Sequence, residues 1–186
     1  MKRFLALIAM ALACLTGFNA NAEGNGMTDK KVLVAYFSAT GTTAGLAAKL
    51  AKAVNGDLFE IKPEQQYSAD DLDWHDKKSR SSVEMADKSS RPAIASKVED
   101  MSRYDAVFVG FPIWWYREPS IIDTFMESYD FAGKTVVPFA TSGGSGIGDS
   151  GKNMQALAPQ ARVLSGKRFA DGVSEEELKK WAAGCF

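Results

Sequence analysis

Lys31-Val-Leu-Val-Ala-Tyr-Phe-Ser-Ala-Thr-Gly-Thr-Thr43 is the stretch of sequence that decides the fold. Its first part, residues 31–37, is a continuous apolar run with β-branched residues at its start, which is typical of a strand buried on both faces. Its second part, residues 38–43, has the hydroxyl and glycine residues of a turn. Apolar residues at helical spacing then predict a helix over 43–54, and a short apolar run predicts a strand over 57–61. The domain therefore begins as a β-α-β unit.

The rest of the chain continues this alternation of strands and helices. Ser174 and Glu177 form a capping box, which marks the start of the last helix. Strands that alternate with helices predict an α/β fold, a doubly wound five-stranded parallel sheet between two layers of helices. The remaining predicted elements are a strand at 105–111, a helix at 120–129, a strand at 134–140, a helix at 153–158, an edge strand at 161–164 and a helix at 174–183.

The polar stretch between residues 62 and 97 departs from this pattern. It is rich in Ser and Asp and too long for a plain connection, so we predict a surface excursion with a short helix at 83–88. Tyr67 and Trp74 are expected to hold the excursion against the domain, or to form a lid. His75 is the only histidine, and neither a cysteine nor a second histidine accompanies it. We therefore expect a solvated loop residue rather than a proton donor or a metal ligand.

The N-terminus has the pattern of an export signal. Lys2 and Arg3 are positive and precede an uncharged stretch, residues 4–18, that is rich in Leu and Ala. Ala20-Asn21-Ala22 then fits the small-x-small pattern of a cleavage site. A membrane span needs about 20 apolar residues, which is more than this stretch provides. We therefore expect a signal peptide over residues 1–22 and an exported, periplasmic protein with no membrane span after the signal is removed.

The two cysteines indicate whether the protein carries a lipid anchor or a disulfide. Cys14 could carry a lipid anchor, but Ala11 stands where a bacterial lipobox normally has Leu, so a lipoprotein is the less favoured alternative. With the signal removed, a linker over 23–30 leads into a domain over 31–186, whose one cysteine is Cys185. We expect no internal disulfide, and we expect the Cys185 thiol to be free on a frayed tail.

The composition excludes several classes of protein. Hydrophobic residues make up 46% of the 186-residue chain and charged residues 24%, which is the balance of an ordinary globular protein and argues against a disordered or coiled-coil chain. The chain has 22 basic and 23 acidic residues, with a net charge of −1. Proteins that bind polyanions usually have a basic excess or stripe, so we expect no nucleic acid as a partner.

Three loops of unusual composition follow the carboxyl ends of predicted strands, where open α/β sheets bind their ligands. The first, residues 38–43, places hydroxyls and one glycine before a helix. Free amides and the positive end of the helix dipole suit a phosphate group there. The loop contains no Lys or Arg, so it is not a Walker A sequence, and a terminal monophosphate fits better than a triphosphate with its metal. The alternative is an ordinary capped helix start.

The second loop is aromatic and the third is rich in glycine. Pro112-Ile-Trp-Trp-Tyr116 cannot turn all of its aromatic rings into the core, so we expect one Trp to pack under the following helix and the other to face a planar ligand. The third loop, residues 141–148, exposes backbone N–H and C=O groups that no bulky side chain covers.

The third loop also contains a false dinucleotide fingerprint. Gly146, Gly148 and Gly151 match G-x-G-x-x-G, and Asp171 follows about twenty residues later. That fingerprint belongs in the first β-α turn of its fold, and the chain after Gly151 is too short for a second half-sheet. A dinucleotide site is therefore rejected.

Together the three loops resemble the flavodoxin family, and the likeness extends from Lys31 to about Trp181. Residues 38–43 are similar to the family's FMN phosphate loop, 110–115 to its second flavin loop, and 139–146 to its third. The resemblance implies a sheet with strand order 2-1-3-4-5 and one non-covalently bound FMN. The cofactor-binding residues that it implies are Ser38, Ala39, Thr40, Gly41, Thr42, Thr43, Pro112, Ile113, Trp114, Trp115, Tyr116, Thr141, Ser142, Gly143, Gly144, Ser145 and Gly146.

Three functions are compatible with this resemblance. The first is electron transfer to a redox partner protein, and the second is an FMN-dependent NAD(P)H:acceptor oxidoreductase that reduces a small molecule such as a quinone or a nitro compound. The third is a binding module on the same fold without the flavin. Pure carriers of the family tend to be strongly acidic and to cover the flavin with an aromatic residue of the third loop. This chain is mildly acidic and has Gly and Ser there, so carrier and reductase both stay open. In either case the chemistry belongs to the flavin, and no catalytic side chain or metal is expected.

Overall fold

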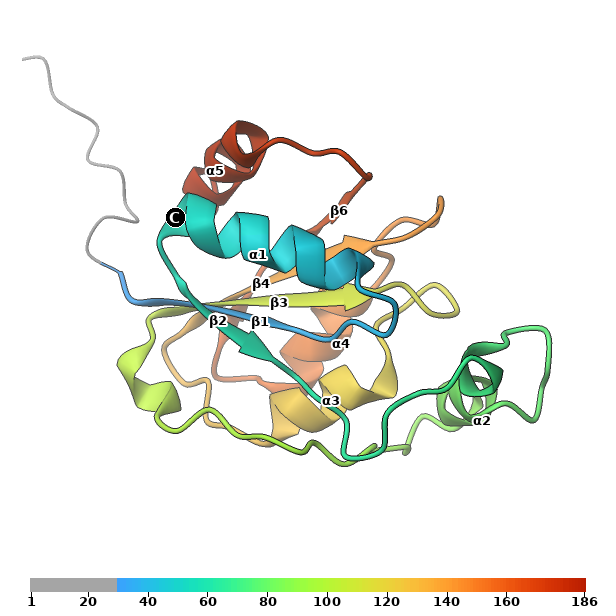
Figure 1. Cartoon of the computed structure of the whole chain (residues 1–186). Helices are drawn as coiled ribbons and strands as arrows, with labels where there is room; N and C mark the ends of the chain where they lie inside the picture. Colours follow the sequence, from blue (N-terminus) through green and yellow to red (C-terminus); the bar gives the residue numbers. More distant parts are fainter. Residues whose placement is uncertain (1–29) are drawn as a thin grey trace, which may run out of the picture.

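The computed structural model describes residues 30–186, so the predicted export signal and most of the predicted linker lie outside the described residues. The strands are β1 (Val32–Tyr36), β2 (Asp57–Glu60), β3 (Ala106–Pro112), β4 (Thr135–Thr141), β5 (Arg162–Val163) and β6 (Lys167–Phe169). They form one parallel sheet in the order β2-β1-β3-β4-β5, with β6 also paired to β4 (Figure 1). The α/β fold and the 2-1-3-4-5 strand order predicted from the sequence are confirmed.

Helices cover both faces of the sheet (Figure 1). One hydrophobic core lies between the sheet and the first and last helices and includes Val34, Leu50 and Phe108, whereas the other lies on the opposite face and includes Val107 and Phe125. Neighbouring residues of β3 thus point into different cores, which is why the central strands read as continuous apolar runs. The helices are α1 (Thr42–Val54), α2 (Arg80–Ala86), α3 (Ser120–Glu127), α4 (Ser150–Leu157) and α5 (Glu175–Ala183), with short 3₁₀ turns at Asp70–Leu72 and Met101–Arg103.

Some element boundaries differ from those predicted. α2 begins at Arg80 rather than at residue 83, because the Ser79 side chain accepts a hydrogen bond from the Ser82 amide and so caps the helix. α4 also begins three residues early, at Ser150. β6 was not predicted, since its Lys-Arg-Phe sequence has no apolar alternation and it pairs with β4 through backbone hydrogen bonds. The capping box at the start of α5 is confirmed.

The C-terminus is packed rather than frayed, which corrects the sequence-based expectation. Cys185 is 8% exposed and lies in the core beside α5, and its thiol is free. Burial raises the pKa of this thiol above its ordinary value, so Cys185 is protonated and poorly reactive at neutral pH. Phe186 packs edge-on against Phe108, with the ring centroids 6.1 Å apart. No helix between residues 30 and 186 is long and apolar enough to cross a membrane.

The excursion between β2 and β3 is anchored at its base. Tyr67 donates a hydrogen bond to Glu84, the Arg80 guanidinium pairs with Glu84 at 2.6 Å, and it also lies over the Tyr67 ring at 4.1 Å. Burial, followed by the Glu84 hydrogen bond, raises the pKa of Tyr67 far above its ordinary value, so its hydroxyl stays a donor. The Tyr67 ring also packs edge-on against Phe37, which follows β1, with the ring centroids 5.7 Å apart, so the expectation that Tyr67 holds the excursion against the domain is confirmed. Trp74 is 67% exposed and does not hold the excursion down.

Candidate functional site

A cleft of about 830 Å³ opens where the strands end, on the side on which Figure 1 shows α2. This volume lies within the roughly 300–1,000 Å³ typical of small-molecule sites. The three loops singled out from the sequence all contribute to its wall, although Gly41 and Gly146 do not line it themselves. The lining residues are Ser38, Ala39, Thr40, Thr42, Thr43, Leu72, Trp74, Ser81, Pro112, Ile113, Trp114, Trp115, Tyr116, Thr141, Ser142, Gly143, Gly144, Ser145 and Asp171.

The first loop presents unpaired amides to the cleft. Gly41 is the N-cap residue of α1 and has φ +91°, a left-handed conformation that glycine adopts at little cost. Its own amide donates to Ser38 Oγ at 3.1 Å, which closes the loop. Within residues 30–186, the amides of Thr40, Thr42 and Thr43 have no hydrogen-bond acceptor. Unpaired amides at the positive end of a helix form an anion-binding site.

The threonines of the first loop divide into two kinds. Thr40 and Thr42 are exposed, and their hydroxyls are not engaged by any other group in the described chain. The Thr43 hydroxyl instead forms a buried hydrogen bond with the Thr141 hydroxyl at 2.8 Å. This bond joins the first loop to the third, and both residues lie in the wall of the cleft. Thr43 can therefore offer a ligand its amide, while Thr40 and Thr42 can also offer hydroxyls.

The second loop is a tight and strained turn. Trp114 and Arg117 exchange two backbone hydrogen bonds of 3.0 Å, and the central residues Trp115 and Tyr116 have φ +45° and +66°. Positive φ at both central positions defines a type I′ turn, which favours Asn-Gly and is costly for bulky side chains. Strain of this kind concentrates at functional sites, where it holds a side chain in a required position.

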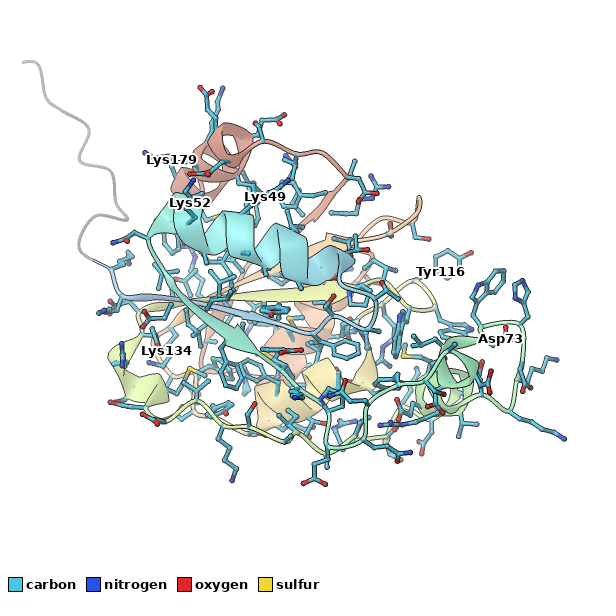
Figure 2. The ribbon with its side chains drawn as sticks, viewed as in Figure 1. Lys49, Lys52, Asp73, Tyr116, Lys134 and Lys179 are labelled. Carbon is cyan, nitrogen blue, oxygen red and sulfur yellow. The ribbon has the colours of Figure 1, made fainter. Side chains whose placement is uncertain are left out.

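The two tryptophans have different surroundings, as expected from the sequence: one is packed and the other is exposed. The packed tryptophan, however, does not contact the element that was predicted to cover it. Trp114 packs edge-on against Phe37 and Tyr67, with ring centroids 5.5 and 5.3 Å away, and not under the following helix. Trp115 is 43% exposed and Tyr116 is 78% exposed. In Figure 2, Tyr116 projects from the body of the sheet toward the side on which the excursion carries Asp73. The turn thus presents aromatic rings to the cleft, and Trp114 anchors it.

A buried ionic cluster lies beneath the strained turn. The Arg117 side chain donates to Asp123 of α3, and Arg91 approaches the same carboxylate at 4.0 Å. Glu118 is completely buried and accepts a hydrogen bond of 2.9 Å from Asn153. Burial is the main cause that raises the pKa of Asp123 to about 6, and the nearby Glu118 carboxylate acts in the same direction. Arg117 therefore ties the turn to a carboxyl that is costly to ionise.

The Asp123 cluster predicts an unusual dependence of stability on pH. Because the pKa is higher in the folded state than its ordinary value of 3.8, the stability from the bound proton is full below about pH 4 and is lost as pH rises through about 6. The Asp123→Asn variant cannot lose this proton. Its free energy of unfolding should rise relative to wild type between pH 4 and 7, by on the order of 1–2 kcal/mol.

Thermal unfolding of both proteins across this pH range measures the effect. The melting temperature of Asp123→Asn minus that of wild type should increase by about 3–6 °C between the two ends of the range. The constant part of the difference reports how the asparagine amide differs from a protonated Asp123 in its contacts, and the slope reports the ionisation of Asp123, including its attraction to Arg117. Asp130→Asn, which removes an exposed carboxylate outside the cluster, is the matched control. Melting temperatures of wild type and Asp123→Asn that run parallel with pH would contradict the raised pKa.

A side-chain hydrogen bond fixes the conformation of the third loop. The Ser142 hydroxyl donates to the Ser145 carbonyl, which closes a short turn. In the described part of the chain, the amides of Gly143, Gly144 and Ser145 have no hydrogen-bond acceptor. A Cβ added at Gly143 or Gly144 would meet no atom within 4 Å, so the space in front of the loop is open. The loop can thus offer amides to the edge of a planar ligand.

Four lining residues lie outside the three predicted loops. Leu72, Trp74 and Ser81 belong to the excursion, and Asp171 follows β6. Trp74 was expected near the cleft only under the alternative that it forms a lid, and the other three were not predicted as site residues, because the path of the excursion depends on contacts between distant residues. His75 is exposed, as expected, and its ring lies 3.5 Å from that of Trp74. Residues 30–186 contain no group of three or more His, Cys, Asp or Glu side chains that could hold a metal ion.

Comparisons with known proteins agree with this geometry. The sequence profile of the flavodoxin family matches residues 31–184. A candidate flavoprotein from Bacteroides eggerthii is 51% identical with a TM-score of 0.80, over 84% of this chain and 98% of that protein. A second, from Bacteroides uniformis, is 54% identical with a TM-score of 0.78, over 82% of this chain and 97% of that protein. No curated protein matches the sequence.

One further solved structure, at lower identity, shares the fold. It is a flavoprotein from Lactobacillus acidophilus in complex with FMN, 24% identical with a TM-score of 0.64, over 82% of this chain and 99% of that protein. The parallel sheet and the cleft at its carboxyl edge define a flavodoxin-like flavoprotein fold. The chain belongs to the flavodoxin family.

Proposed function

We propose that the protein binds FMN non-covalently in the three-loop cleft and transfers electrons through it. The observation that carries this proposal is the convergence of two sets of unpaired amides and one aromatic turn on a single cleft. The Lactobacillus flavoprotein, which is bound to FMN in its own structure, gives further support. The flavin would supply the electron-transfer chemistry, and the protein would bind it, orient it and shape its electrostatics.

Each loop suits one part of FMN. The amides and hydroxyls around Thr40 and Thr42 would hold the phosphate, since they combine free donors with the positive end of α1. Trp115 would flank the isoalloxazine, because its ring is exposed on the strained turn. The amides of Gly144 and Ser145 would meet the pyrimidine edge of the ring, where donors bias the redox equilibrium.

The strained turn allows a test of the aromatic platform. Replacing Trp115 and Tyr116 together by Asn and Gly gives the sequence that type I′ turns favour. We expect the apo protein to become more stable by about 1 kcal/mol or more as backbone strain is relieved, while FMN affinity falls about tenfold or more. Melting temperature and FMN titration measure the two effects. Tyr116→Phe, which keeps the strain and the ring, should change neither. A less stable variant with unchanged affinity would contradict the platform.

A reductase of small molecules is the alternative form of this function, and the third loop favours it. That loop carries only Gly and Ser side chains at 142–146, so one face of the flavin would be open to an acceptor. Trp74 of the excursion adds an exposed aromatic ring to the same cleft. A neutral planar acceptor such as a quinone or a nitro compound suits such a wall.

Absorption spectra of the purified protein, before and after addition of FMN, test the proposal. We expect flavin bands that stay with the protein through gel filtration. If no flavin stays bound, the protein is a binding module on the same fold. NAD(P)H oxidation is then followed with and without a quinone. Rapid NAD(P)H oxidation that requires the quinone identifies a reductase. Slow NAD(P)H oxidation both with and without the quinone identifies a carrier that depends on a protein partner.

We also propose that the protein is exported and works in the periplasm, on the signal pattern of residues 1–22. Lys2-Arg3 is not a twin-arginine pair, so an unfolded chain would be secreted and would acquire FMN outside the cytoplasm. Fractionation of the native cell should find the protein in the envelope with flavin bound. Fully flavin-free protein in that fraction, at normal flavin supply, would argue against FMN use there.

A further inference from the structure

Arg168 lies directly behind the third loop of the cleft. It is the central residue of β6 and pairs with Ala140 of β4, one residue before the loop begins. The next residue, Phe169, is buried and packs against Trp181 with ring centroids 4.9 Å apart. Successive side chains of a strand point to opposite faces, so Arg168 is directed away from this core. The side chain is half-buried against the loop.

The Arg168 guanidinium clamps the third loop through Ser142. Its Nε donates to Ser142 Oγ at 3.2 Å, and its Nη2 donates to the Ser142 carbonyl oxygen at 3.2 Å. Ser142 in turn donates to the Ser145 carbonyl, and both serines line the cleft. Because the Ser142 carbonyl is turned toward Arg168, the loop presents amides rather than this oxygen to the cleft. A guanidinium fork fixes two acceptors at once, which a lysine cannot do.

The charge of Arg168 is not neutralised locally. Among residues 30–186, no carboxylate oxygen lies within 4.0 Å of its guanidinium, whereas Arg80, Arg91, Arg103 and Arg117 all have such partners. No Lys or Arg side chain of the described chain lines the cleft, and Asp171 is its one carboxylate. Arg168 is therefore a positive charge in contact with Ser142 of the third loop. The pyrimidine edge of the flavin would lie against the other side of this loop.

We propose that Arg168 is a positioning residue that raises the reduction potential of the bound flavin. This inference rests on the proposed function, because it assumes that FMN lies in the cleft. Reduction adds electrons to the ring, and a nearby positive charge in a half-buried site favours the more negative, reduced form. Arg168 would act through the third loop, by holding its amides toward the ring and by its own charge. Reduced FMN would thus bind more tightly, relative to oxidised FMN, than without Arg168.

Two variants separate the charge from the geometry. Arg168→Met removes both the charge and the two hydrogen bonds, whereas Arg168→Lys keeps the charge without the fork. Lys167→Met is the matched control, because it removes a neighbouring exposed charge whose ammonium lies over the Phe169 ring and not on the third loop. Dissociation constants for oxidised and reduced FMN are measured by tryptophan fluorescence, and the midpoint potential of the loaded protein by redox titration against reference dyes.

For Arg168→Met, affinity for reduced FMN should fall about tenfold more than affinity for oxidised FMN. This ratio corresponds to a midpoint potential about 30 mV lower for a two-electron couple. Arg168→Lys should recover most of the potential but not all of the affinity for oxidised FMN, and Lys167→Met should change neither. Equal losses for both redox forms of FMN, with an unchanged potential, would show a merely structural role and overturn the proposal. If wild type binds no FMN, the proposed function itself fails, which is a distinguishable result.

Discussion

Replacing both Thr40 and Thr42 by valine is expected to weaken FMN binding by about 100-fold. The two hydroxyls are exposed in the first loop and unengaged within residues 30–186, so they are free to donate to a phosphate. A hydrogen bond to a charged group contributes roughly 1.5–3 kcal/mol, and two such bonds account for a loss of this size. Valine keeps the β-branched shape, so the fold and the loop amides should be preserved. FMN titration followed by tryptophan fluorescence gives the dissociation constants.

Thr135→Val is the matched control for this loss. It makes the same chemical change on β4, at the opposite end of the strand from the cleft. Its affinity for FMN should equal that of wild type, and all three proteins should melt within a few degrees of one another. If the Thr40→Val, Thr42→Val protein is folded and binds FMN as tightly as wild type, the assignment of these two hydroxyls to the phosphate site is contradicted.

Gly110→Ala should cause the largest loss of stability of any single methyl group added to the sheet. Gly110 pairs with Phe139 across β3 and β4, and a Cβ at this position would overlap the ring carbons of Phe139. The Phe139 ring is completely buried between the sheet and α1, so it cannot swing away. Overpacking of this kind costs about 3 kcal/mol, and the melting temperature should fall by about 6–12 °C.

Two further variants isolate the steric cause. Gly45→Ala makes the same change at an exposed position of α1, where a Cβ would meet nothing within 4 Å, so it should raise stability slightly through higher helix propensity. Gly110→Ala combined with Phe139→Leu should recover part of the stability, because the smaller side chain leaves room for the added methyl group. A Gly110→Ala protein as stable as wild type would show that the close approach of this ring to the strand is not needed.

The fold could be predicted because its signals are local. The apolar run at 31–37 ends abruptly in the hydroxyl-rich loop, and the same switch recurs after β3 and β4, so strand ends and loops are visible in the sequence itself. The parallel order of the strands then follows from the alternation with helices and from the family resemblance. The aromatic turn could also be predicted from the sequence. Trp115 and Tyr116 follow a strand whose own side chains are buried on both faces of the sheet, so further aromatic rings at its end are exposed.

The remaining features of the site depend on contacts between residues far apart in the sequence. Trp114 packs on Tyr67 of the excursion, and Arg168 clamps Ser142, yet no local pattern links either pair. β6 was not predicted because its Lys-Arg-Phe sequence has no apolar alternation, although its backbone pairs with β4. Cys185 was expected on a frayed tail because proximity to a terminus suggests exposure, whereas the core beside α5 extends to the last residues.

Calorimetric titration of the flavin-free protein with FMN, and in parallel with riboflavin, tests the central claim most directly. The two ligands share the isoalloxazine and differ in the phosphate. Riboflavin affinity therefore measures binding by the rest of the cleft, and the ratio of the two affinities measures the contribution of the first loop. The predicted result is one FMN per chain, bound about 100-fold more tightly than riboflavin, as the unpaired amides of Thr40, Thr42 and Thr43 require. Equal affinity for both ligands, or no binding of FMN, would contradict the assignment of this cleft as an FMN site.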